Sequence, residues 1–251
     1  SPEYYFPGCG VQVQEMLDIK TCPALDVRNQ CSGFIYGLSV ADQFIKTGMY
    51  KNVLLIGSEN HSGGLDMTTR GRSVSVIFGD GAGAAVLTRS DHNGQGILST
   101  HLHSEGKHAL ELSLKGPSTM HWVPEIIEEN PQEDIPYYPY MNGQYVFKNA
   151  VQRFSEVIME GLQENGLEVS DIDMLIPHQA NLRISQFIQQ KFKLNDDQVF
   201  NNIQKYGNTT AASIPIALTE AWEQGKIKEG DHVVLAAFGS GFTWASAVIN
   251  W

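Results

Sequence analysis

Apolar residues recur at intervals of three and four through residues 34–45, which is the spacing of one buried face of an α-helix. Gly48 follows this run and supplies a stop signal, so we expect the helix to end there. The helix begins at or just after Cys31, which stands between the polar residues Gln30 and Ser32. Its apolar face consists of Phe34, Ile35, Leu38, Val40, Ala41, Phe44 and Ile45.

Several shorter segments carry strand patterns. Residues 23–27 are expected to form a short buried strand, and the apolar run NVLLIGSE at 52–59 predicts a buried parallel strand. Residues 73–90 predict two strands around a glycine-rich bend, and a further strand begins at residue 96. The first part of the chain therefore combines one helix with several strands, which is the pattern of an α/β protein.

The second part of the chain shows the same mixture. Residues 107–142 are irregular and proline-rich, and a long connection of this kind is more often functional or mobile than purely structural. A helix is predicted over residues 146–165, and residues 171–192 predict a strand, a loop and a second helix.

Two segments of the chain resemble each other in layout. Residues 31–59 and 208–241 both contain a start of small residues, a helix, a glycine stop and a buried strand that ends near glycine. Cys31 and Asn208 stand at the same distance from their stop glycines, Gly48 and Gly225. If the two segments fold as packed α/β units, both helix starts meet at one central cleft.

Composition narrows the class of protein. The chain has 251 residues and a formal net charge of −11, which argues against general nucleic-acid binding. No apolar run approaches the roughly 20 residues that span a bilayer, and no signal peptide is recognisable. The odd number of cysteines does not suggest a disulfide framework, so Cys9 and Cys22 are interpreted as structural and the protein as cytoplasmic.

Cys31 is the first candidate for chemistry. A helix start presents unpaired N–H groups and a partial positive charge, which stabilise a thiolate and lower a cysteine pKa below its usual value of about 8.5. A reactive nucleophile can be made in this way without a metal. The alternative is that Cys31 is a small buried hydrophobic residue, as most free cysteines are.

Three further segments carry candidate residues. His178 follows a predicted strand in a loop that leads into a helix, a common place for a catalytic histidine, although a hydrogen-bonded core histidine is the alternative. Asn208 stands at a helix start, where it is also a preferred N-cap. Gly239, Ser240 and Gly241 end a buried strand, where backbone N–H groups can approach a ligand and bind an oxyanion. The segment FGDGAGA at 78–84 lacks the strand–turn–helix context of a dinucleotide fingerprint, so that reading is rejected.

Six segments in order, NQCSGF, FGDGAGAAVL, MNGQYVFKNAV, PHQANLRI, YGNTTAASIP and AAFGSGFTW, resemble the 3-oxoacyl-ACP synthase III family of the thiolase-like superfamily. The resemblance covers essentially the whole chain. It implies a thiolase-like α/β fold with two similar halves in five layers (α-β-α-β-α). Residues 1–90 would be the remainder of the first half and residues 91–251 the second. The first half is expected to be N-terminally incomplete, by a segment on the order of eighty residues.

The resemblance also implies a reaction and a set of roles. Cys31 would be the nucleophile that takes an acyl group from acyl-CoA, and the backbone N–H groups of Cys31 and Ser240 would form the oxyanion hole. His178 and Asn208 would stabilise the enolate formed when malonyl-ACP loses carbon dioxide. The product would be 3-oxoacyl-ACP, the first intermediate of fatty acid biosynthesis, and neither a metal nor an organic cofactor would be needed.

Substrate contacts follow from the same resemblance. Arg72 falls where the family places an arginine that contacts coenzyme A, although Arg70 could be that residue instead. The alternative for both is an arginine that lies in solvent and contacts no substrate. Phe6 would cross a homodimer interface and close the partner's acyl tunnel, unless it is an ordinary core residue. The other expected substrate-binding residues are Phe147, Asn181 and Phe238, and those expected to dock acyl carrier protein are Lys148, Arg183 and Lys191, followed by Lys205.

Two other functions stay open at this point. A relative could pass the acyl group to a different acceptor, as in quinolone or polyketide synthesis, while keeping Cys31 and His178. The chain could also be an inactive partner subunit, although the presence of Cys31, His178 and Asn208 together argues against that. No partnership with nucleic acid or membrane is expected.

Overall fold

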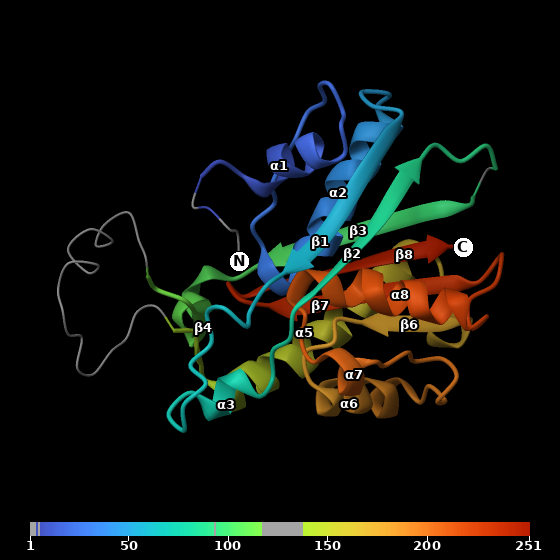
Figure 1. The fold of residues 1–251 in the computed structure, drawn as a ribbon. Helices are drawn as coiled ribbons and strands as arrows, with labels where there is room; N and C mark the ends of the chain where they lie inside the picture. The colour runs from blue at the N-terminus through green and yellow to red at the C-terminus, as the bar shows by residue number, and fades with distance from the viewer. Residues whose placement is uncertain (1–3, 5, 93, 117–137) are drawn as a thin grey trace.

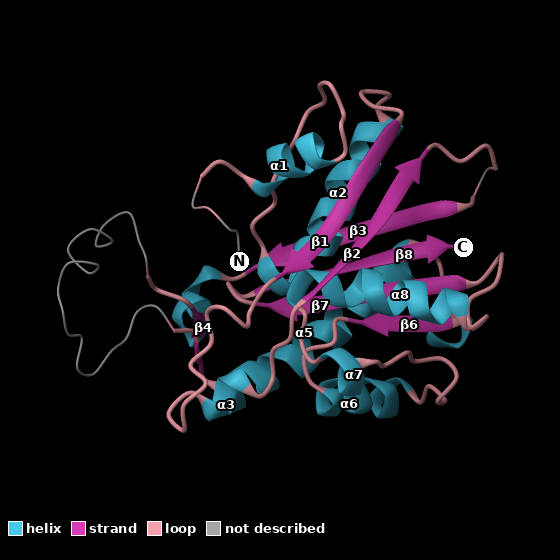
Figure 2. Cartoon of the chain, viewed as in Figure 1, coloured by secondary structure: helices cyan, strands magenta, loops and turns pink. Residues whose placement is uncertain are grey.

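The structure is a computed structural model that describes residues 4, 6–92, 94–116 and 138–251. The described residues form three sheets. Figure 1 shows helices between the two larger sheets and on one outer face, and Figure 2 shows the same view by secondary structure. The elements up to residue 90 are α1 (Cys9–Met16), the 3-10 helix η1 (Gln30–Ser32), α2 (Gly33–Lys46), β1 (Asn52–Glu59), α3 (Arg72–Ser75) and β2 (Gly81–Thr88).

The elements after residue 90 form the larger part of the core. They are β3 (Gly96–Ser104), η2 (Gly106–Glu111), β4 (Leu112–Ser113), β5 (Tyr140–Met141), α5 (Gly143–Glu164), η3 (Val169–Asp171), β6 (Met174–Pro177), α6 (Leu182–Phe192), α7 (Ile203–Tyr206), η4 (Thr210–Ala212), α8 (Ser213–Glu223), β7 (His232–Gly239) and β8 (Thr243–Asn250).

Strands β1 and β2 form the first sheet, and the second sheet has the strand order β3-β8-β7-β6. Strand β6 runs parallel to β7, with Pro177 opposite Ala236, and the other neighbours are antiparallel. Both faces of this sheet are covered, because α5 packs on one face, with α6 beside it, and α2 and α8 pack on the other. Strands β6 and β7 are therefore almost fully buried, as their continuous apolar sequences require.

The first sheet differs from the sequence prediction. Strand β1 pairs with β2 in antiparallel register, so the parallel, fully buried strand expected at 52–59 is wrong. Side chains alternate along the pair: Leu55 packs toward the helices, whereas Leu54, Ile56 and Val86 on the other face are 44%, 40% and 69% exposed. Burial on both faces fails here because, within the described residues, helices cover this pair on one face only.

Two other expected strands are absent from the described residues. Residues 23–27 have no regular secondary structure and are exposed, with Leu25 63% exposed, and no strand of the described residues pairs with them. The first strand expected within 73–90 is instead the short helix α3, whose turn begins where Gly71 O accepts the N–H groups of Val74 and Ser75.

The helices agree with the sequence prediction. Helix α2 begins directly after Cys31 and ends before Gly48, whose φ of +74° suits a glycine stop. Helices α5 and α6 cover the segments predicted from the apolar periodicity. Of the irregular stretch 107–142, residues 117–137 lie outside the described residues. Among the residues that are described, no helix combines the length and apolar content needed to cross a bilayer.

The two similar segments pack against each other as predicted. A 3-10 turn precedes each helix, η1 before α2 and η4 before α8, and the two turns are in contact. The approach is close enough to require glycine: a Cβ atom on Gly57 would lie 2.3 Å from the carbonyl oxygen of Ala211. Both helix starts therefore meet at one place. The domain boundary at residue 90 stays a prediction.

We predict that Gly57→Ala destabilises the fold, because its new methyl group meets backbone that cannot rotate away. Overpacking of this kind costs about 1–3 kcal/mol. Denaturant unfolding of Gly57→Ala and of Gly106→Ala measures the effect, since a Cβ atom at Gly106 meets nothing within 4 Å. Equal stability of the two variants would contradict the close contact between the halves.

Candidate active site

Cys31 lies in η1, immediately before α2, and is 6% exposed. The backbone at the end of β7 lies against it: a Cβ atom on Gly239 would be 2.9 Å from Cys31 Sγ. The backbone at this strand end therefore approaches Cys31 closely, and its expected approach to a ligand stays a prediction. The turn between β7 and β8 is tied to η1, since the hydroxyl oxygens of Ser32 and Thr243 lie 2.6 Å apart.

The electrostatic prediction for Cys31 is wrong. Burial raises the pKa of its thiol to about 12, and the nearby charge of Glu59 adds to the rise. The backbone N–H groups of Ser240 and of Cys31 itself oppose the rise, because both can donate to a negative charge at Sγ. The resting site therefore holds a neutral thiol, with the backbone N–H groups of Cys31 and Ser240 directed at its sulfur.

His178 directly follows β6 and is 3% exposed. Its N–H donates to Ala236 O at 2.7 Å, which holds the residue at the end of the sheet beside β7. Its Nδ1 lies 2.6 Å from Ser213 Oγ at the start of α8. Nε2 is buried and has no hydrogen-bond partner among the described residues.

The tautomer of His178 follows from the hydrogens around Ser213. Ser213 Oγ already accepts the N–H of Gln179 at 3.3 Å, and the described residues offer its own hydrogen no acceptor other than His178 Nδ1. If Nδ1 carried the proton, the buried hydroxyl hydrogen would have no partner, which is costly. Ser213 therefore donates to Nδ1, and the proton of the neutral ring is on Nε2.

The charge state of the ring is also determined by its surroundings. Burial lowers the pKa of His178 to about 3, and the nearby His61 contributes in the same direction. At neutral pH the ring is therefore uncharged, and Nε2–H is a buried donor without an acceptor among the described residues. Such a donor suits an oxygen that becomes negative during a reaction.

Gln179 fixes the loop that carries His178, a role that the sequence did not reveal. Its Nε2 donates to Pro177 O at 2.7 Å and to Phe200 O at 3.3 Å, and its Oε1 accepts the N–H groups of Asn202 and Ile203. The glutamine amide thus joins the end of β6 at Pro177 to residues 200–203.

Asn208 is 5% exposed and lies beside residues 77–79, with Asn208 N donating to Ile77 O at 2.8 Å and Gly79 N donating to Asn208 O at 3.0 Å. Its Oδ1 accepts the N–H of Thr210 at 2.9 Å. The prediction that Asn208 is a helix N-cap is wrong, because Thr209 stands at the N-cap of η4 and Ala212 at that of α8. Because Oδ1 is engaged, the amide group left for a substrate is Nδ2, a donor.

These residues gather at one end of the second sheet. Cys31 lies against the end of β7, His178 follows the parallel neighbour β6, and His178 is bonded to the start of α8, just after Asn208. The sequence identified these three residues, but it missed the positioning roles of Ser213, Gln179 and Thr210.

The remaining substrate-binding candidates are spread more widely. Arg72 is exposed at the start of α3, whereas Arg70 is held by Asp66 at 2.6 Å. Phe6 is 75% exposed, so the alternative of an ordinary core residue is wrong within this chain. Asn181 caps α6 by accepting the N–H of Arg183 at 3.0 Å.

Two aromatic candidates belong to the core behind the site. Phe238 is 3% exposed on β7 and packs against Phe242 with ring centroids 4.8 Å apart and ring planes tilted by 53°. Phe147 is partly buried against the same cluster. Both roles in substrate binding stay predictions.

The candidate docking residues Lys148, Arg183 and Lys191 are exposed on the neighbouring helices α5 and α6. Lys205 lies 3.3 Å from Glu220 and is thus engaged in an ion pair. The described ranges contain no cluster of three or more His, Cys, Asp or Glu side chains arranged to hold a metal ion.

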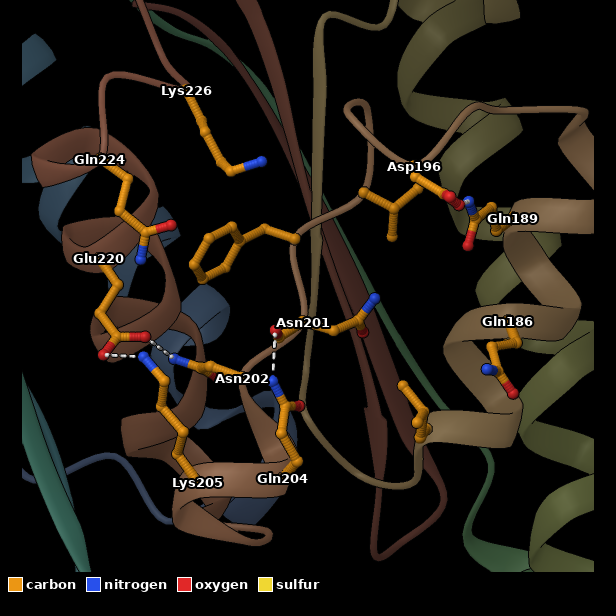
Figure 3. A pocket seen from close by; sticks show the side chains of 13 residues that line it. Gln186, Gln189, Asp196, Asn201, Asn202, Gln204, Lys205, Glu220, Gln224 and Lys226 are labelled. Atoms are coloured by element: carbon orange, nitrogen blue, oxygen red, sulfur yellow. Dashed lines mark hydrogen bonds and ion pairs between the residues drawn. The ribbon is translucent and has the colours of Figure 1, made fainter.

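A separate polar hollow of about 430 Å³ lies between α6, α7 and α8 (Figure 3). Asn202 and Lys205, which line it, both donate to Glu220, and Gln186 and Gln189 line the opposite side. It contains none of Cys31, His178 and Asn208, so its role lies outside the site described above.

The layered arrangement of two sheets around α2 and α8 is a thiolase-like fold. Solved structures of β-ketoacyl-(acyl-carrier-protein) synthase III from Thermus thermophilus and of 3-oxoacyl-(acyl-carrier-protein) synthase III from Aquifex aeolicus superpose with TM-scores of 0.90 and 0.88. They are 37% and 41% identical to this chain, and each match covers all of this chain and 74% of the other.

Sequence comparison gives the family. The model described as 3-oxoacyl-(acyl-carrier-protein) synthase III matches residues 25–106, and the model of the C-terminal part of the same enzymes matches residues 162–251. The β-ketoacyl-(acyl-carrier-protein) synthase III of Aliivibrio fischeri is 46% identical over 251 residues, which cover all of this chain and 74% of the relative. The chain belongs to the 3-oxoacyl-(acyl-carrier-protein) synthase III family.

We predict that His178 makes stability fall in acid. The unfolded chain binds this proton with a pKa of about 6.5, and the folded chain with a pKa of about 3. The contribution is fully present above pH about 6.5 and is lost as the pH falls toward 3, because the unfolded state then binds more protons. Denaturant unfolding measures the free energy of unfolding at each pH in this range. The slope of that free energy against pH should be shallower for His178→Gln than for the wild type.

The matched control is His92→Gln, which replaces an exposed histidine. Its free energy of unfolding should depend on pH as steeply as that of the wild type. An unchanged slope in His178→Gln would show that the ring is not held neutral in the folded protein.

Proposed function

We propose that this chain is a β-ketoacyl-ACP synthase III that condenses an acyl-CoA starter with malonyl-ACP to begin fatty acid synthesis. The observation that supports this most directly is the buried Nε2–H of His178, which has no hydrogen-bond partner among the described residues and is held in one tautomer by Ser213. Family membership and the similar enzymes give the substrates their names.

In the first half-reaction the Cys31 sulfur attacks the acyl thioester carbonyl. The carbonyl oxygen gains negative charge and receives hydrogen bonds from the N–H groups of Cys31 and Ser240. The bond to the coenzyme A sulfur then breaks, and the proton of the Cys31 thiol leaves with coenzyme A. A thioester at Cys31 and free coenzyme A are the products.

In the second half-reaction malonyl-ACP loses carbon dioxide. The electron pair of the broken C–C bond forms an enolate, whose oxygen accepts hydrogen bonds from His178 Nε2 and Asn208 Nδ2. The enolate carbon attacks the acyl carbonyl at Cys31, the C–S bond breaks, and the sulfur takes up a proton. Because burial raises the pKa of Cys31, the released sulfur returns to the neutral thiol. These steps use neither a metal nor an organic cofactor.

A second candidate has a specific observation in its favour. The structure named as the priming β-ketosynthase of the R1128 polyketide pathway is 28% identical and superposes with a TM-score of 0.87. The same residues would then perform the same chemistry with a different acceptor. Comparing malonyl-ACP from fatty acid synthesis with a polyketide carrier protein as the acceptor distinguishes the two.

We further propose a cytoplasmic homodimer. The resemblance to the family supports this proposal, and Phe6, which is 75% exposed in this chain, is the residue expected to cross the interface.

We predict that Cys31→Ala takes up no acyl group from acyl-CoA, whereas His178→Ala and Asn208→Ala are acylated but release carbon dioxide slowly. Loss of one donor to a developing oxyanion costs about 3 kcal/mol in the barrier. Intact mass reports acylation, and carbon dioxide release from malonyl-ACP reports the second half-reaction. Cys22→Ala, which removes an exposed thiol, is the control and should behave as wild type. Acylation of Cys31→Ala at the wild-type rate would refute the proposed nucleophile.

We predict that the basic residues on α5 and α6 guide an acidic carrier protein to the site. Arg183→Glu should raise the KM for malonyl-ACP severalfold and flatten its dependence on salt, because surface attraction is screened by ions. Lys228→Glu makes the same charge change before β7, at the opposite end of that strand from Cys31, and should change neither quantity. If the two variants respond alike, Arg183 is not part of the docking surface.

A further inference from the structure

His61 lies two residues beyond β1, and its ring bridges two segments that lead to Asn208. Nδ1 is 2.9 Å from the carbonyl oxygen of Gly79, and Nε2 is 3.1 Å from Thr210 Oγ1. A carbonyl oxygen can only accept, so Nδ1 carries the hydrogen of the neutral ring. Nε2 is then an acceptor, and the Thr210 hydroxyl donates to it.

Thr210 is the residue that needs this support. Its φ is +51°, in the left-handed region that a β-branched side chain rarely adopts, and it is 2% exposed. Two hydrogen bonds hold it there: its N–H donates to Asn208 Oδ1 at 2.9 Å, and its hydroxyl donates to His61. The bond to Asn208 Oδ1 is the one that turns the amide so that Nδ2 is free for a substrate.

His61 is itself held firmly. The Asp80 carboxylate accepts the backbone N–H groups of His61 at 2.6 Å and of Ser62 at 2.9 Å. The ring packs on Phe78, with ring centroids 4.6 Å apart, and Gly79 N donates to Asn208 O at 3.0 Å. His61, Thr210, Asn208 and Gly79 therefore form a closed circuit of hydrogen bonds, with the imidazole bridging both sides.

We propose that His61 is a positioning residue for the decarboxylation step. It acts through Thr210, whose strained backbone it fixes, and so determines the direction of Asn208 Nδ2. The inference rests on the proposed function, in which this amide donates to the enolate oxygen. None of the hydrogen bonds of His61 reaches Cys31, so formation of the acyl-enzyme should not depend on it.

The test uses variants that remove one group at a time. His61→Phe keeps a ring against Phe78 but removes both nitrogen atoms, and Thr210→Val keeps the branched shape but removes the hydroxyl. Each should slow carbon dioxide release from malonyl-ACP about tenfold, the effect of losing one hydrogen bond of ordinary strength. Acylation of Cys31, followed by intact mass, should stay within about twofold of wild type.

Two comparisons distinguish positioning from general stability. The double variant His61→Phe with Thr210→Val should be no slower than His61→Phe alone, because the loss of the imidazole already breaks the bond that Thr210→Val removes. His61→Gln places an amide oxygen where Nε2 stood, and Thr210→Ser keeps the hydroxyl, so both should recover most of the lost rate. This recovery would not follow from a ring that only fills space.

Carbon dioxide release by the wild-type protein tests the proposed function separately from the role of His61. Absence of carbon dioxide release from wild type would refute that function. Release by wild type, together with an unchanged rate in both His61→Phe and Thr210→Val, would overturn the role of His61 alone. Equal loss of acylation and decarboxylation in these variants would also overturn it, because that pattern indicates a structural role.

Discussion

The hydrogen bond from Ser213 Oγ to His178 Nδ1 is the interaction on which the chemistry of this site depends. It is 2.6 Å long and joins the end of β6 to the start of α8. It decides which nitrogen of a buried, uncharged ring carries the proton. Without it, Nε2 could be an acceptor, and an acceptor repels the enolate oxygen that the proposed reaction generates.

The bond lies beside the place where two similar α/β segments pack together at their helix starts, since Ser213 directly follows η4 and η4 contacts η1. Gly57 and Gly239 mark two close approaches in this region, at the backbone of Ala211 and at Cys31. The helices α2 and α8 lie between the sheets, as Figure 1 shows, and η1 contacts both η4 and β7, which encloses Cys31. The same enclosure removes water from Cys31, which is why burial outweighs the favourable field of the helix start.

Much of this arrangement could be predicted from the sequence. The helix after Cys31, its end near Gly48 and the strand before His178 follow from local signals, namely apolar periodicity and stop residues. The orientation of β1 could not be predicted, because the unbroken apolar run at 52–59 is typical of a buried parallel strand, whereas half of its side chains face outward here.

The residues that support the site could not be predicted from local sequence patterns, for a different reason. Ser213 is 35 residues from His178, and Thr210 is 149 residues from His61. A serine, a threonine or a histidine in these positions has no distinctive spacing, and its role appears only when the partner is brought close by the fold. The pKa of Cys31 likewise depends on burial, a property of the tertiary structure.

Nitrogen NMR of the protein labelled with ¹⁵N-histidine tests the central claim most directly. The chain has eight histidines, and comparison with His178→Gln assigns the ring of interest. The account predicts that His178 carries its proton on Nε2, with Nδ1 unprotonated, at neutral pH and down to about pH 5, well below the usual histidine pKa. A proton on Nδ1, or a ring that becomes doubly protonated near pH 6.5, would contradict it.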